Sequence, residues 1–571
     1  MNKPYKKKIN DKWVVADFET TTEKFYNERG YTEVWLYAIS DKNGKILNYG
    51  FTIKEFMKYI KKNLNGYIIY FHNLKFDGSF ILNYILENKI PYKDKIFSND
   101  TQCYNTLISE EGQFYQITLH FNAKQEVRFQ DSLKLLPFKV RKIAEDFNLE
   151  WNGEDLRKLK IDYNDYSVDK TKLDYVFNDV RVVALALNQI KNEGMINMTT
   201  ASCAYNSYIN DMLFTDTFFP VLDEKFLIEW RNGYRGGRSQ VNPLYANVVL
   251  HNVRRYDVNS MYSYIMYTKE LPIGKPIKCN KIGQYKFELY KINVKFTLKE
   301  GHLPTLLKKN FVFGGGLYYE NLEEIETIWI SSIDYELLLR HYNIECIQFL
   351  EIYGFKTCDF LFKNYIDKWY AIKNREKGAK KQVAKLMLNS LYGKFGSNCK
   401  GRSKLPYLND NGELEFNNSE EQDMRKYYLP IAIAITSYAH KLIDDAIMST
   451  GYDNFVYCDT DSVHTLGTLS PELIDNKELG KFKLESIEIT SKYVRPKTYV
   501  YKELNEKDEI VYSITCAGMN DDCKEYALDT FGDDIFNKFQ TGFEIHGKKL
   551  IPKQVKGGMI LVETSFKIKE E

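Results

Sequence analysis

The sequence lacks the features that mark several protein classes. Its 571 residues include nine cysteines, an odd number, and no two of them are spaced as C-x-x-C. The odd number argues against a disulfide framework and the spacing against structural zinc, so we expect reduced thiols in a cytosolic setting. No run of about 18 apolar residues occurs, and no apolar stretch follows the basic start MNKPYKKKIN, so we expect neither a membrane span nor a secretory signal.

An excess of charge of either sign is also absent. Lys and Arg number 79 and Asp and Glu 77, so the net charge of +2 gives no overall indication of a nucleic-acid partner. The basic residues are nevertheless clustered. Residues 367–404 hold eleven basic and two acidic residues, and residues 491–502 and 545–558 each hold four basic residues and no acidic one. Such patches suit phosphate, whereas solvated lysine-rich faces are the alternative that charge alone leaves open.

The length indicates several domains, because a usual domain has roughly 100–200 residues. With 44% hydrophobic and 27% charged residues the composition is that of a globular protein. A strand pattern (WVVADFE) opens the chain, and a helical run (LDYVFNDVRVVALALNQI) ends before a Gly/Met/Asn/Thr stretch at 194–200, where we expect a domain boundary. No repeat of fixed period follows, so a mixed α/β or α+β body is expected.

The second part of the chain shows two long helices and two hairpins by their local patterns. The helices are predicted over 360–378 and 379–393, and Gly393 is the expected stop of the second. Asn-Gly within 405–416 lies between two short apolar runs, which is a strong hairpin signal. A second hairpin is predicted over 454–466 (NFVYCDTDSVHTL).

The first group of candidate functional residues is acidic. Asp17 and Glu19 are two apart at the end of the first apolar run, so strand periodicity places both carboxylates on one face. Hard divalent cations prefer such oxygens, although a solvated strand face is the alternative for this pair alone. Asp77 lies in YFHNLKFDGSF, and Tyr175 and Asp179 share a helix face at i, i+4. Together they could bind two ions on a scissile phosphate, with the tyrosine orienting the attacking water.

The second group follows the same logic with different residues. Asp257 ends the run VRRYD, and Asp459 and Asp461 flank Thr460 in VYCDTDSVH. Three aspartates could hold two Mg²⁺ ions about 3.5–4 Å apart, which phosphoryl transfer from a triphosphate needs. Ordinary turn chemistry is the alternative for the D-T-D triplet.

The helix predicted over 379–393 could supply the cations. Lys381, Lys385 and Asn389 fall at i, i+4 and i+8, and Tyr392 follows at i+11, so one face carries two ammonium groups, an amide and a ring. Such a face could bind a triphosphate and stack on a base. An amphipathic helix with merely solvated lysines is the alternative.

Taken together and in this order, these residues resemble the protein-primed family B DNA polymerases of phi-twenty-nine-like small tailed phages. DFETT, HNLKFDG and YVFND are similar to the three exonuclease motifs of that family, and DVNSMY, KLMLNSLYGKF, YCDTDS and KTY are similar to its polymerase motifs. YRGG at 234–237 is similar to the linker motif that binds the template strand. The resemblance spans essentially the whole chain. It implies an α/β and α+β multidomain fold, in which an RNase H-like exonuclease domain precedes a right-hand polymerase domain of palm, fingers and thumb.

The resemblance also implies seven segments. They are the 3'-5' exonuclease domain (1–197), the first part of the palm (198–268), a first terminal-protein-region insertion (269–360), the fingers (361–396), a second insertion (397–428), the second part of the palm (429–526) and the thumb (527–571).

Site roles carry over from the matched motifs. The implied exonuclease metal ligands are Asp17, Glu19, Asp77 and Asp179, with Tyr175 orienting the water. The implied ligands of the single-stranded 3' end are Thr20, His72, Asn73, Phe76, Ser132 and Leu133. The template strand would meet Tyr234, Arg235, Gly236 and Gly237, and the primer terminus would meet Lys497 and Tyr499. The implied polymerase metal ligands are Asp257, Val258, Asp459 and Asp461. The nucleotide would be bound by Val258, Tyr262, Lys373, Lys381, Lys385, Asn389 and Tyr392.

Tyr262 matches the ring that rejects a 2'-hydroxyl, and the chain departs from the family beside it, since Ser263 stands where proline is usual. The implied reaction is attack by a primer 3'-hydroxyl on the α-phosphate of a dNTP, with two Mg²⁺ ions, or Mn²⁺ in their place, in each active site. The implied partners are primer-template DNA, dNTPs and a phage terminal protein as primer. A processive, strand-displacing monomer in the cytoplasm of the infected bacterial host is expected. A nucleic-acid-primed family B polymerase and a catalytically inactive DNA-binding relative are the alternatives.

Overall fold

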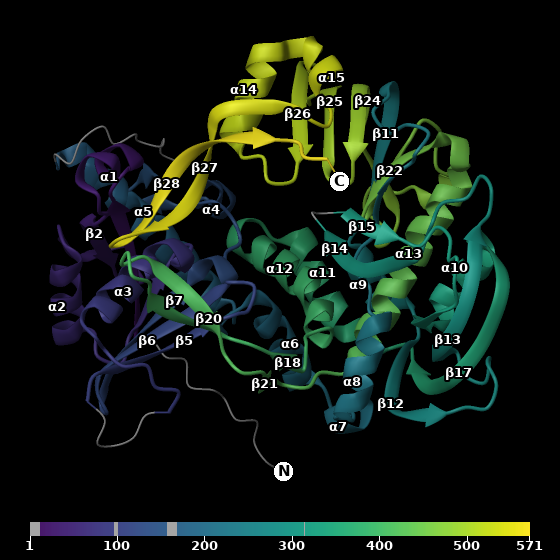
Figure 1. The fold of residues 1–571 in the computed structure, drawn as a ribbon, viewed down its shortest axis with the longest axis horizontal. Helices are drawn as coiled ribbons and strands as arrows, with labels where there is room; N and C mark the ends of the chain where they lie inside the picture. Colours follow the sequence, from purple (N-terminus) through teal and green to yellow (C-terminus); the bar gives the residue numbers. More distant parts are fainter. Residues whose placement is uncertain (1–11, 96–100, 157–167, 313–314, 571) are drawn as a thin grey trace.

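The computed structural model describes residues 12–95, 101–156, 168–312 and 315–570 (Figure 1). In Figure 1 the N-terminal part, purple to blue, forms one lobe, and most of the remaining chain, teal to green, forms the other. The yellow C-terminal hairpin reaches back from the second lobe to the first.

A mixed seven-stranded sheet forms the centre of the first lobe. Its order is β3-β2-β1-β4-β7-β6-β5, and β4 runs parallel to both of its neighbours. The strands are β1 (Trp13–Thr20), β2 (Val34–Ser40), β3 (Ile46–Gly50), β4 (Ile68–Phe71), β5 (Cys103–Ile108), β6 (Phe114–Asn122) and β7 (Gln125–Asp131). The helices are α1 (Glu23–Arg29), α2 (Ile53–Asn63), α3 (Leu74–Glu87), α4 (Val140–Phe147) and α5 (Lys170–Asn192), and a short ladder pairs β8 (Glu150–Trp151) with β9 (Glu154–Asp155).

Strand β1 is buried on both faces because helices cover both sides of the sheet. Trp13 and Val15 pack into the core that α4 and α5 share, whereas Val14, Ala16 and Phe18 pack into the core formed with α2 and α3. This alternation is the strand period of two. It follows that the residues two and four positions after Val15 lie on the α5 side.

A second seven-stranded sheet, antiparallel throughout, lies in the other lobe. Its order is β10-β22-β23-β11-β24-β25-β26. The strands are β10 (Ser239–Val241), β11 (Val249–Val258), β22 (Phe455–Asp459), β23 (Ser462–Thr465), β24 (Phe482–Arg495), β25 (Thr498–Leu504) and β26 (Ile510–Cys516). The hairpin predicted over 454–466 is therefore confirmed as β22–β23.

Helices pack around this sheet and join it to the first lobe. They are α6 (Thr200–Asp211), α7 (Thr215–Phe218), α8 (Glu224–Trp230), α9 (Met261–Thr268), α11 (Lys363–Arg375), α12 (Gly378–Phe395) and α13 (Leu429–Thr450). The predicted stop of α12 at Gly393 is wrong by two residues. The helix continues because Phe395 is fully buried in the core, and it ends at Gly396, whose N–H bonds the carbonyls of Gly393 and Lys394.

Residues 271–358 build a four-stranded sheet of their own, in the order β12-β17-β13-β16. Its elements are β12 (Leu271–Lys278), β13 (Phe287–Leu298), β16 (Glu326–Ser331), α10 (Ser332–His341) and β17 (Tyr342–Cys358). Within this segment β14 (Leu307–Val312) and β15 (Gly315–Tyr318) form a separate two-stranded ladder. A separate apolar cluster that includes Ile292, Phe296 and Ile330 holds the sheet together.

Two further hairpins extend from the second lobe to the first. The predicted Asn-Gly hairpin is confirmed as β19 (Lys404–Leu408) and β20 (Leu414–Asn418), beside the short ladder of β18 (Lys400–Gly401) and β21 (Gln422–Asp423). The C-terminal region comprises α14 (Asp521–Phe531), α15 (Ile535–Lys538) and the long hairpin of β27 (Glu544–Val555) and β28 (Gly558–Lys567). Leu414 of the first hairpin and Met559 of the second are both buried in the core of the first lobe.

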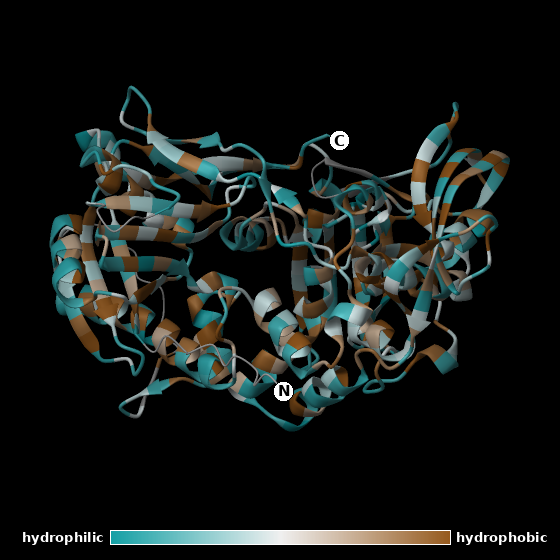
Figure 2. Ribbon diagram, turned by 90° about the horizontal axis from the view of Figure 1, so that it is seen from below, coloured by the Kyte–Doolittle hydropathy of each residue, from teal (hydrophilic) through white to brown (hydrophobic). Residues whose placement is uncertain are grey.

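Hydrophobic and hydrophilic residues alternate along the strands and helices of both lobes, and many of the loops are hydrophilic (Figure 2). Among the helices of the described part of the chain, none is both long and apolar enough to span a bilayer.

Candidate active sites

The first group of predicted carboxylates gathers between β1, α3 and α5. Asp17 and Glu19 lie two and four residues after Val15, so β1 presents them toward α5. Asp77 lies in the first turn of α3, which begins after Asn73 takes a left-handed conformation, with φ 79°. Asp17, Asp179 and His72 line one small cavity. The structure thus places residues that are up to about 160 positions apart in the sequence around one point.

Burial raises the pKa values of Asp17, Asp77 and Asp179, and repulsion by neighbouring acids adds to it for Asp77 and Asp179. Burial raises the pKa of Asp17 to about 6, and burial together with the charge of Asp17 raises that of Asp179 to about 7. Burial, followed by the charges of Asp17 and Glu19, raises the pKa of Asp77 well above its usual value. Burial and then the charges of Asp179, Glu19 and Asp17 raise the pKa of the Tyr175 hydroxyl, so it remains protonated. Such a cluster is stabilised by cations.

The donor set fits Mg²⁺ or Mn²⁺, because its members are hard carboxylate oxygens that lie near one another and repel. Asp77 is buried, and Asp17, Glu19 and Asp179 are half-buried. This fit rests on the chemical type of the donors and not on their spacing. Within the described ranges, no three acidic, histidine or cysteine side chains lie close enough together to form a metal centre.

The residues predicted to hold a single-stranded 3' end lie beside this cluster. His72 shares hydrogen bonds with the Ser132 hydroxyl (3.0 Å) and the Phe138 carbonyl (2.8 Å). The backbone N–H groups of Asn73 and Leu133 both donate to Asp131 Oδ1, at 3.1 and 3.0 Å. Asp131 therefore joins the segment before α3, which holds Asn73, to the turn that holds Leu133.

The remaining two residues of that set are placed at the edges of the same region. Phe76 lies in the first turn of α3 with its ring 5.9 Å from that of Phe80. Thr20 ends β1, and its carbonyl accepts a hydrogen bond from the Trp35 indole (3.0 Å).

The second group of carboxylates gathers where β11 and the β22–β23 hairpin end. Asp257 pairs with Ser462 across the sheet, and Val258 N donates to the carbonyl of Asp461 at 2.8 Å. Asp459 is the last residue of β22, and Thr460 turns the chain with φ 57°. Burial, then the charges of Asp461 and Glu485, raises the pKa of Asp257 to about 7. The turn therefore brings the three predicted aspartates together.

Lys497 and Tyr499 lie against this turn. The Lys497 ammonium donates to both carboxylate oxygens of Asp459, at 2.8 Å each. The Tyr457 hydroxyl donates to Asp459 Oδ2 (3.3 Å) and accepts from the backbone N–H of Lys497 (3.1 Å). Tyr499 packs in an aromatic group with Tyr457 and Tyr493, at ring distances of 5.2 and 5.1 Å. Of the two predicted primer-terminus residues, Lys497 thus contacts Asp459 directly, and Tyr499 lies next to it through Tyr457.

A basic face of α11 and α12 is opposed to these acids. The Lys373 ammonium donates to Ser260 Oγ at 2.8 Å. Burial, then the positive charges of Lys385 and Lys381, lowers the pKa of Lys373, while Asp257 acts in the opposite direction. Lys381, Lys385 and Asn389 are exposed on α12. The structure therefore places the predicted cation face near Asp257, one of the predicted carboxylates.

The two tyrosines predicted to bind nucleotide are stacked on each other. The rings of Tyr262 on α9 and Tyr392 on α12 lie 4.0 Å apart at an angle of 24°. Burial and then, among the nearby charges, that of Asp461 raise the pKa of both hydroxyls, so the stack lies near this aspartate.

In the YRGG segment Arg235 is buried, whereas Tyr234, Gly236 and Gly237 are half-buried. The guanidinium group of Arg235 is buried and donates to the carbonyls of Leu307 (3.1 Å) and Trp329 (3.0 Å). The carbonyl of Gly236 hydrogen-bonds His440 at 2.6 Å. The Tyr234 ring lies under the Arg231 guanidinium at 5.5 Å. A template contact at these four residues stays a prediction, and the side chain of Arg235 is already committed to protein carbonyls.

Comparison with known proteins gives a consistent result. The model of DNA polymerase type B, organellar and viral, matches residues 58–167 and 154–479. The DNA polymerase of Bacillus phage M2 is 37% identical over 599 residues, which covers 98% of this chain and 100% of that protein. The DNA polymerase of Streptococcus phage Cp-1 is 33% identical, with 98% and 99% covered. The chain belongs to the family B DNA polymerases.

The structure of this polymerase agrees with solved ones. The phi29 DNA polymerase complexed with primer-template DNA and incoming nucleotide substrates matches it with a TM-score of 0.87 and 34% identity, covering 98% of this chain and 100% of that chain. The orthorhombic crystal form of the phi29 enzyme gives a TM-score of 0.88. The expected fold, an exonuclease domain followed by palm, fingers and thumb, is therefore confirmed, as is DNA-directed DNA polymerase activity, whereas the seven segment boundaries stay predictions.

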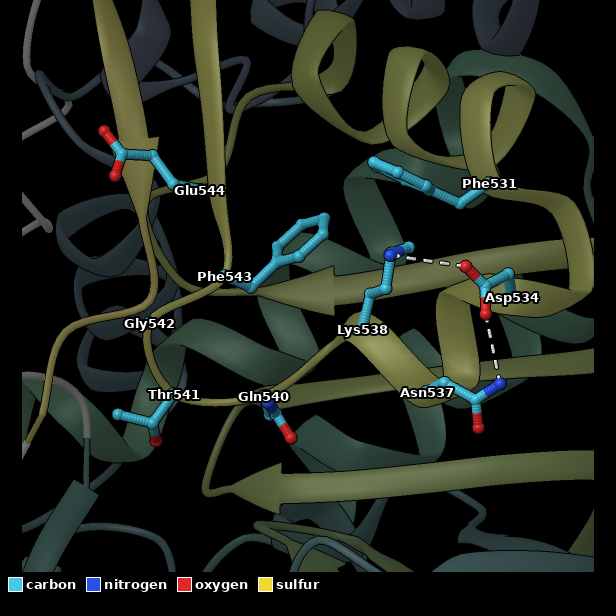
Figure 3. Close-up of a pocket in the computed structure, with 9 residues that line it drawn as sticks. All are labelled: Phe531, Asp534, Asn537, Lys538, Gln540, Thr541, Gly542, Phe543 and Glu544. Atoms are coloured by element: carbon cyan, nitrogen blue, oxygen red, sulfur yellow. Dashed lines mark hydrogen bonds and ion pairs between the residues drawn. The ribbon is translucent and has the colours of Figure 1, made fainter.

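A hollow in the C-terminal region is not part of either carboxylate group. It is lined by nine residues between Phe531 and Glu544, among them the rings of Phe531 and Phe543 (Figure 3). Its Lys538 ammonium is paired with Asp534 at 3.5 Å, and Asn537 donates to the same residue at 3.1 Å. The hollow holds none of the predicted site residues, and its charges are already paired.

Two residues of these sites were missed by sequence reasoning. Asp131 had a faint signal, since an acid directly before Ser132 suits the start of a helical turn, and its side chain does accept from Leu133 N. Tyr457 belongs to YCDTDS, but nothing in the motif indicates that its hydroxyl joins Asp459 to Lys497. Both act between segments that are distant in the sequence.

Proposed function

We propose that this polymerase is a proofreading, protein-primed replicase of a phage genome, with separate sites for synthesis and for 3'-5' hydrolysis. The observation that carries the proposal is the presence of two carboxylate clusters in separate lobes, one on β1, α3 and α5 and the other on β11 and the β22–β23 turn. The first cluster lies beside Tyr175 and His72, and the second beside Lys497 and the lysines of α11 and α12. A single-activity polymerase would need only the second.

At the synthesis site, Asp257, Asp459 and Asp461 would hold two Mg²⁺ ions, with the backbone of Val258 beside them. The ions would supply Lewis-acid activation of the primer hydroxyl and neutralise charge on the triphosphate. The ammonium groups of α11 and α12 would hold the triphosphate, because phosphoryl transfer depends mainly on positioning and charge stabilisation. Lys497, which lies on Asp459, would hold the primer terminus next to the reacting atoms.

The stacked rings of Tyr262 and Tyr392 would act on the nucleotide. In the structure the two rings contact each other, so an incoming nucleotide would separate them and stack on Tyr392. Tyr262 would then lie against the sugar, where its ring leaves no room for a 2'-hydroxyl.

At the hydrolysis site, Asp17, Glu19, Asp77 and Asp179 would hold the second pair of Mg²⁺ ions. The Tyr175 hydroxyl remains protonated there and would orient the attacking water. His72, Asn73 and the Ser132–Leu133 turn would hold the frayed 3' end, together with Phe76 and Thr20. Asp131 would fix these loops with respect to each other.

The two hairpins support a strand-displacing, processive mode. The β19–β20 hairpin places Leu414 in the core of the exonuclease domain, and the Phe416 ring lies 5.8 Å from Phe114. The β27–β28 hairpin reaches the same domain through Met559, and its tip lies beside the tip of the β19–β20 hairpin, since a Cβ at Gly412 would be 3.5 Å from the Lys556 side chain. Because both hairpins rest on one domain, they would enclose DNA between the lobes, and separation of a downstream duplex would follow.

The 269–360 segment would bind the terminal protein, whose hydroxyl primes synthesis. It forms a separate sheet with its own apolar core, as a partner-binding insertion requires. The enzyme would work as a monomer in the cytoplasm of the infected bacterium.

The decisive experiment uses a labelled primer on a template with a downstream blocking strand. Mg²⁺ alone should give shortening, and Mg²⁺ with four dNTPs should give full-length product without helicase or clamp. Asp459→Asn should abolish extension and retain shortening, Asp17→Ala with Glu19→Ala should do the reverse, and Asp508→Asn, in an exposed turn, should do neither. Extension by Asp459→Asn, or loss of both activities in either variant, would contradict two separate sites.

Protein priming needs its own assay. The polymerase is incubated with Mg²⁺, a labelled dNTP and the terminal protein encoded by the same phage, and labelled protein is measured on a denaturing gel. Label on the terminal protein is the expected result. Extension of a DNA primer without any such label would favour the nucleic-acid-primed alternative.

A further inference from the structure

The last arginine of the YRGGR segment forms a buried ion pair with α13. Arg238 and Asp444 are each 1% exposed, and Arg238 Nη1 donates to Asp444 Oδ1 at 3.1 Å. The Nε of the same guanidinium donates to Gln240 at 3.0 Å. A buried charge is tolerated only when it is paired and hydrogen-bonded, so this geometry fixes Arg238 on α13.

Asp444 also forms hydrogen bonds with two side chains of α10, which lies in the 269–360 segment. Arg340 Nη1 donates to Asp444 Oδ2 at 2.7 Å, and His341 Nε2 contacts the same oxygen at 2.9 Å. Burial by itself raises the pKa of Asp444, but the hydrogen bond from His341, the charge of Arg238 and the hydrogen bond from Arg340 outweigh it, so the pKa is lowered and the carboxylate stays charged. One side chain therefore joins the palm helix, the YRGGR segment and the 269–360 segment.

Arg238 is in turn bound to the catalytic turn. Its carbonyl accepts a hydrogen bond from Thr460 N at 2.6 Å, and the next residue, Ser239, pairs with Asp459 across β10 and β22. A Cβ at Gly237 would lie 2.7 Å from Thr460 Oγ1, so the two segments are in tight contact. The placement of Thr460, between Asp459 and Asp461, thus depends on where Arg238 is held.

We propose that Asp444 is a positioning residue for nucleotide incorporation, which sets the Asp459–Asp461 turn through Arg238 and ties that turn to the 269–360 segment through Arg340 and His341. The inference rests on the proposed role of Asp459 and Asp461. Asp444 lies in the core rather than on the substrate-binding face. Its effect on the reaction is through geometry, and a displacement of about 1 Å at reacting groups costs roughly 100-fold in rate.

The test compares two adjacent aspartates on the same helix turn. Asp444→Asn removes the charge that holds Arg238. Asp445→Asn is the matched control, because Asp445 also accepts from Arg340 (2.7 Å) but is half exposed, and Arg238 bonds to Asp444 instead. Single-nucleotide insertion is measured on a primer-template, with degradation of single-stranded DNA by the same preparation as internal reference.

Asp444→Asn is expected to lower kcat for insertion by roughly 10- to 100-fold while KM for the dNTP and the degradation rate change by less than about twofold. Asp445→Asn should stay within about twofold of wild type in all three. If Asp444→Asn does not fold, Arg238→Met and Arg238→Lys replace it, since Asp444 then keeps Arg340 and His341 as partners. Arg238→Met should show the same selective loss, and Arg238→Lys should recover most of it.

Full kcat in a folded Asp444→Asn or Arg238→Met variant would overturn the inference. An equal loss of insertion and degradation would also overturn it, since a general loss of structure affects both. The proposed polymerase site is tested separately. Primer extension by Asp459→Asn would refute that site. If Asp459→Asn is inactive and Asp444→Asn is fully active, only the positioning role of Asp444 is refuted.

Discussion

The tip of the β27–β28 hairpin can rest on the exonuclease domain only because Gly557 has no side chain. Gly557 has φ 93°, and a Cβ there would overlap the backbone carbonyl oxygen of Thr32. Backbone cannot move aside as the end of a flexible side chain can. Gly557→Ala should therefore lift the tip from the domain while the hairpin and both lobes remain folded.

The cost of lifting the tip can be worked out from its contacts. Thr32 N donates to the Lys556 carbonyl at 3.0 Å, and Gln554 Nε2 donates to Ser79 Oγ at 3.0 Å. At about 1 kcal/mol for each hydrogen bond, their loss is about 2 kcal/mol, which is a lower bound because Met559 is also buried in the core of the first lobe. Since 1.4 kcal/mol is a tenfold change in an equilibrium constant, the closed form should become at least about 30-fold less favoured relative to the open one.

The assay is extension of a primed single-stranded circle in the presence of a DNA trap that captures dissociated enzyme. Gly557→Ala should shorten the product made in one binding event by about tenfold or more, with insertion of the first nucleotide changed by less than about twofold. Gly547→Ala is the matched control in the same hairpin, because Gly547 also has positive φ, 64°, but no atom lies within 4 Å of the added Cβ. Wild-type product lengths from Gly557→Ala, or an equal shortening by Gly547→Ala, would refute the reasoning.

Three further predictions concern the sites and the other hairpin. In metal-free buffer Asp179→Asn should stabilise the protein by a few kcal/mol above pH 7 and by nothing near pH 4, as measured by calorimetry. The folded wild-type protein keeps the Asp179 proton up to about pH 7, whereas the unfolded chain loses it near pH 3.8. The stability of the wild-type protein therefore falls as the pH rises through that window, and the variant lacks this loss. Tyr262→Val should raise ribonucleotide incorporation relative to dNTP incorporation by roughly 10- to 200-fold in competition assays, since the ring that excludes the 2'-hydroxyl is gone. Leu414→Ala should weaken seating of the β19–β20 hairpin by about 2–3 kcal/mol, which should reduce synthesis through a downstream duplex but not on single-stranded template.

Local patterns in the sequence predicted much of the fold and of both candidate sites. The apolar run of β1, the helix that carries Tyr175 and Asp179, and the two hairpins each depend on a period or a turn signal within about twenty residues. The end of α12 was missed because a tertiary contact, burial of Phe395, overrides the stop signal of Gly393. Propensity is a weak predictor where packing decides.

Contacts between distant segments could not be predicted in the same way. Arg238 and Asp444 are 206 positions apart, and Arg235 binds carbonyls 72 and 94 positions away. The charge of these residues is equally consistent with an exposed DNA-binding face, which is how Arg235 is interpreted from sequence. Only the topology, which brings β10, α10 and α13 together, shows that both arginines point inward.

The buried arginine Arg238 helps to explain how the palm keeps its catalytic geometry although the 269–360 segment is inserted into it. Asp459 and Asp461 lie on a two-strand turn, which has little stiffness of its own, and Thr460 takes a left-handed backbone conformation there. The turn is held from one side by Lys497 and Tyr457 and from the other by the carbonyl of Arg238. Because Arg238 is anchored through Asp444 to α10, movement of the 269–360 segment is coupled to the turn. A partner bound to that segment could therefore affect incorporation without contacting the aspartates.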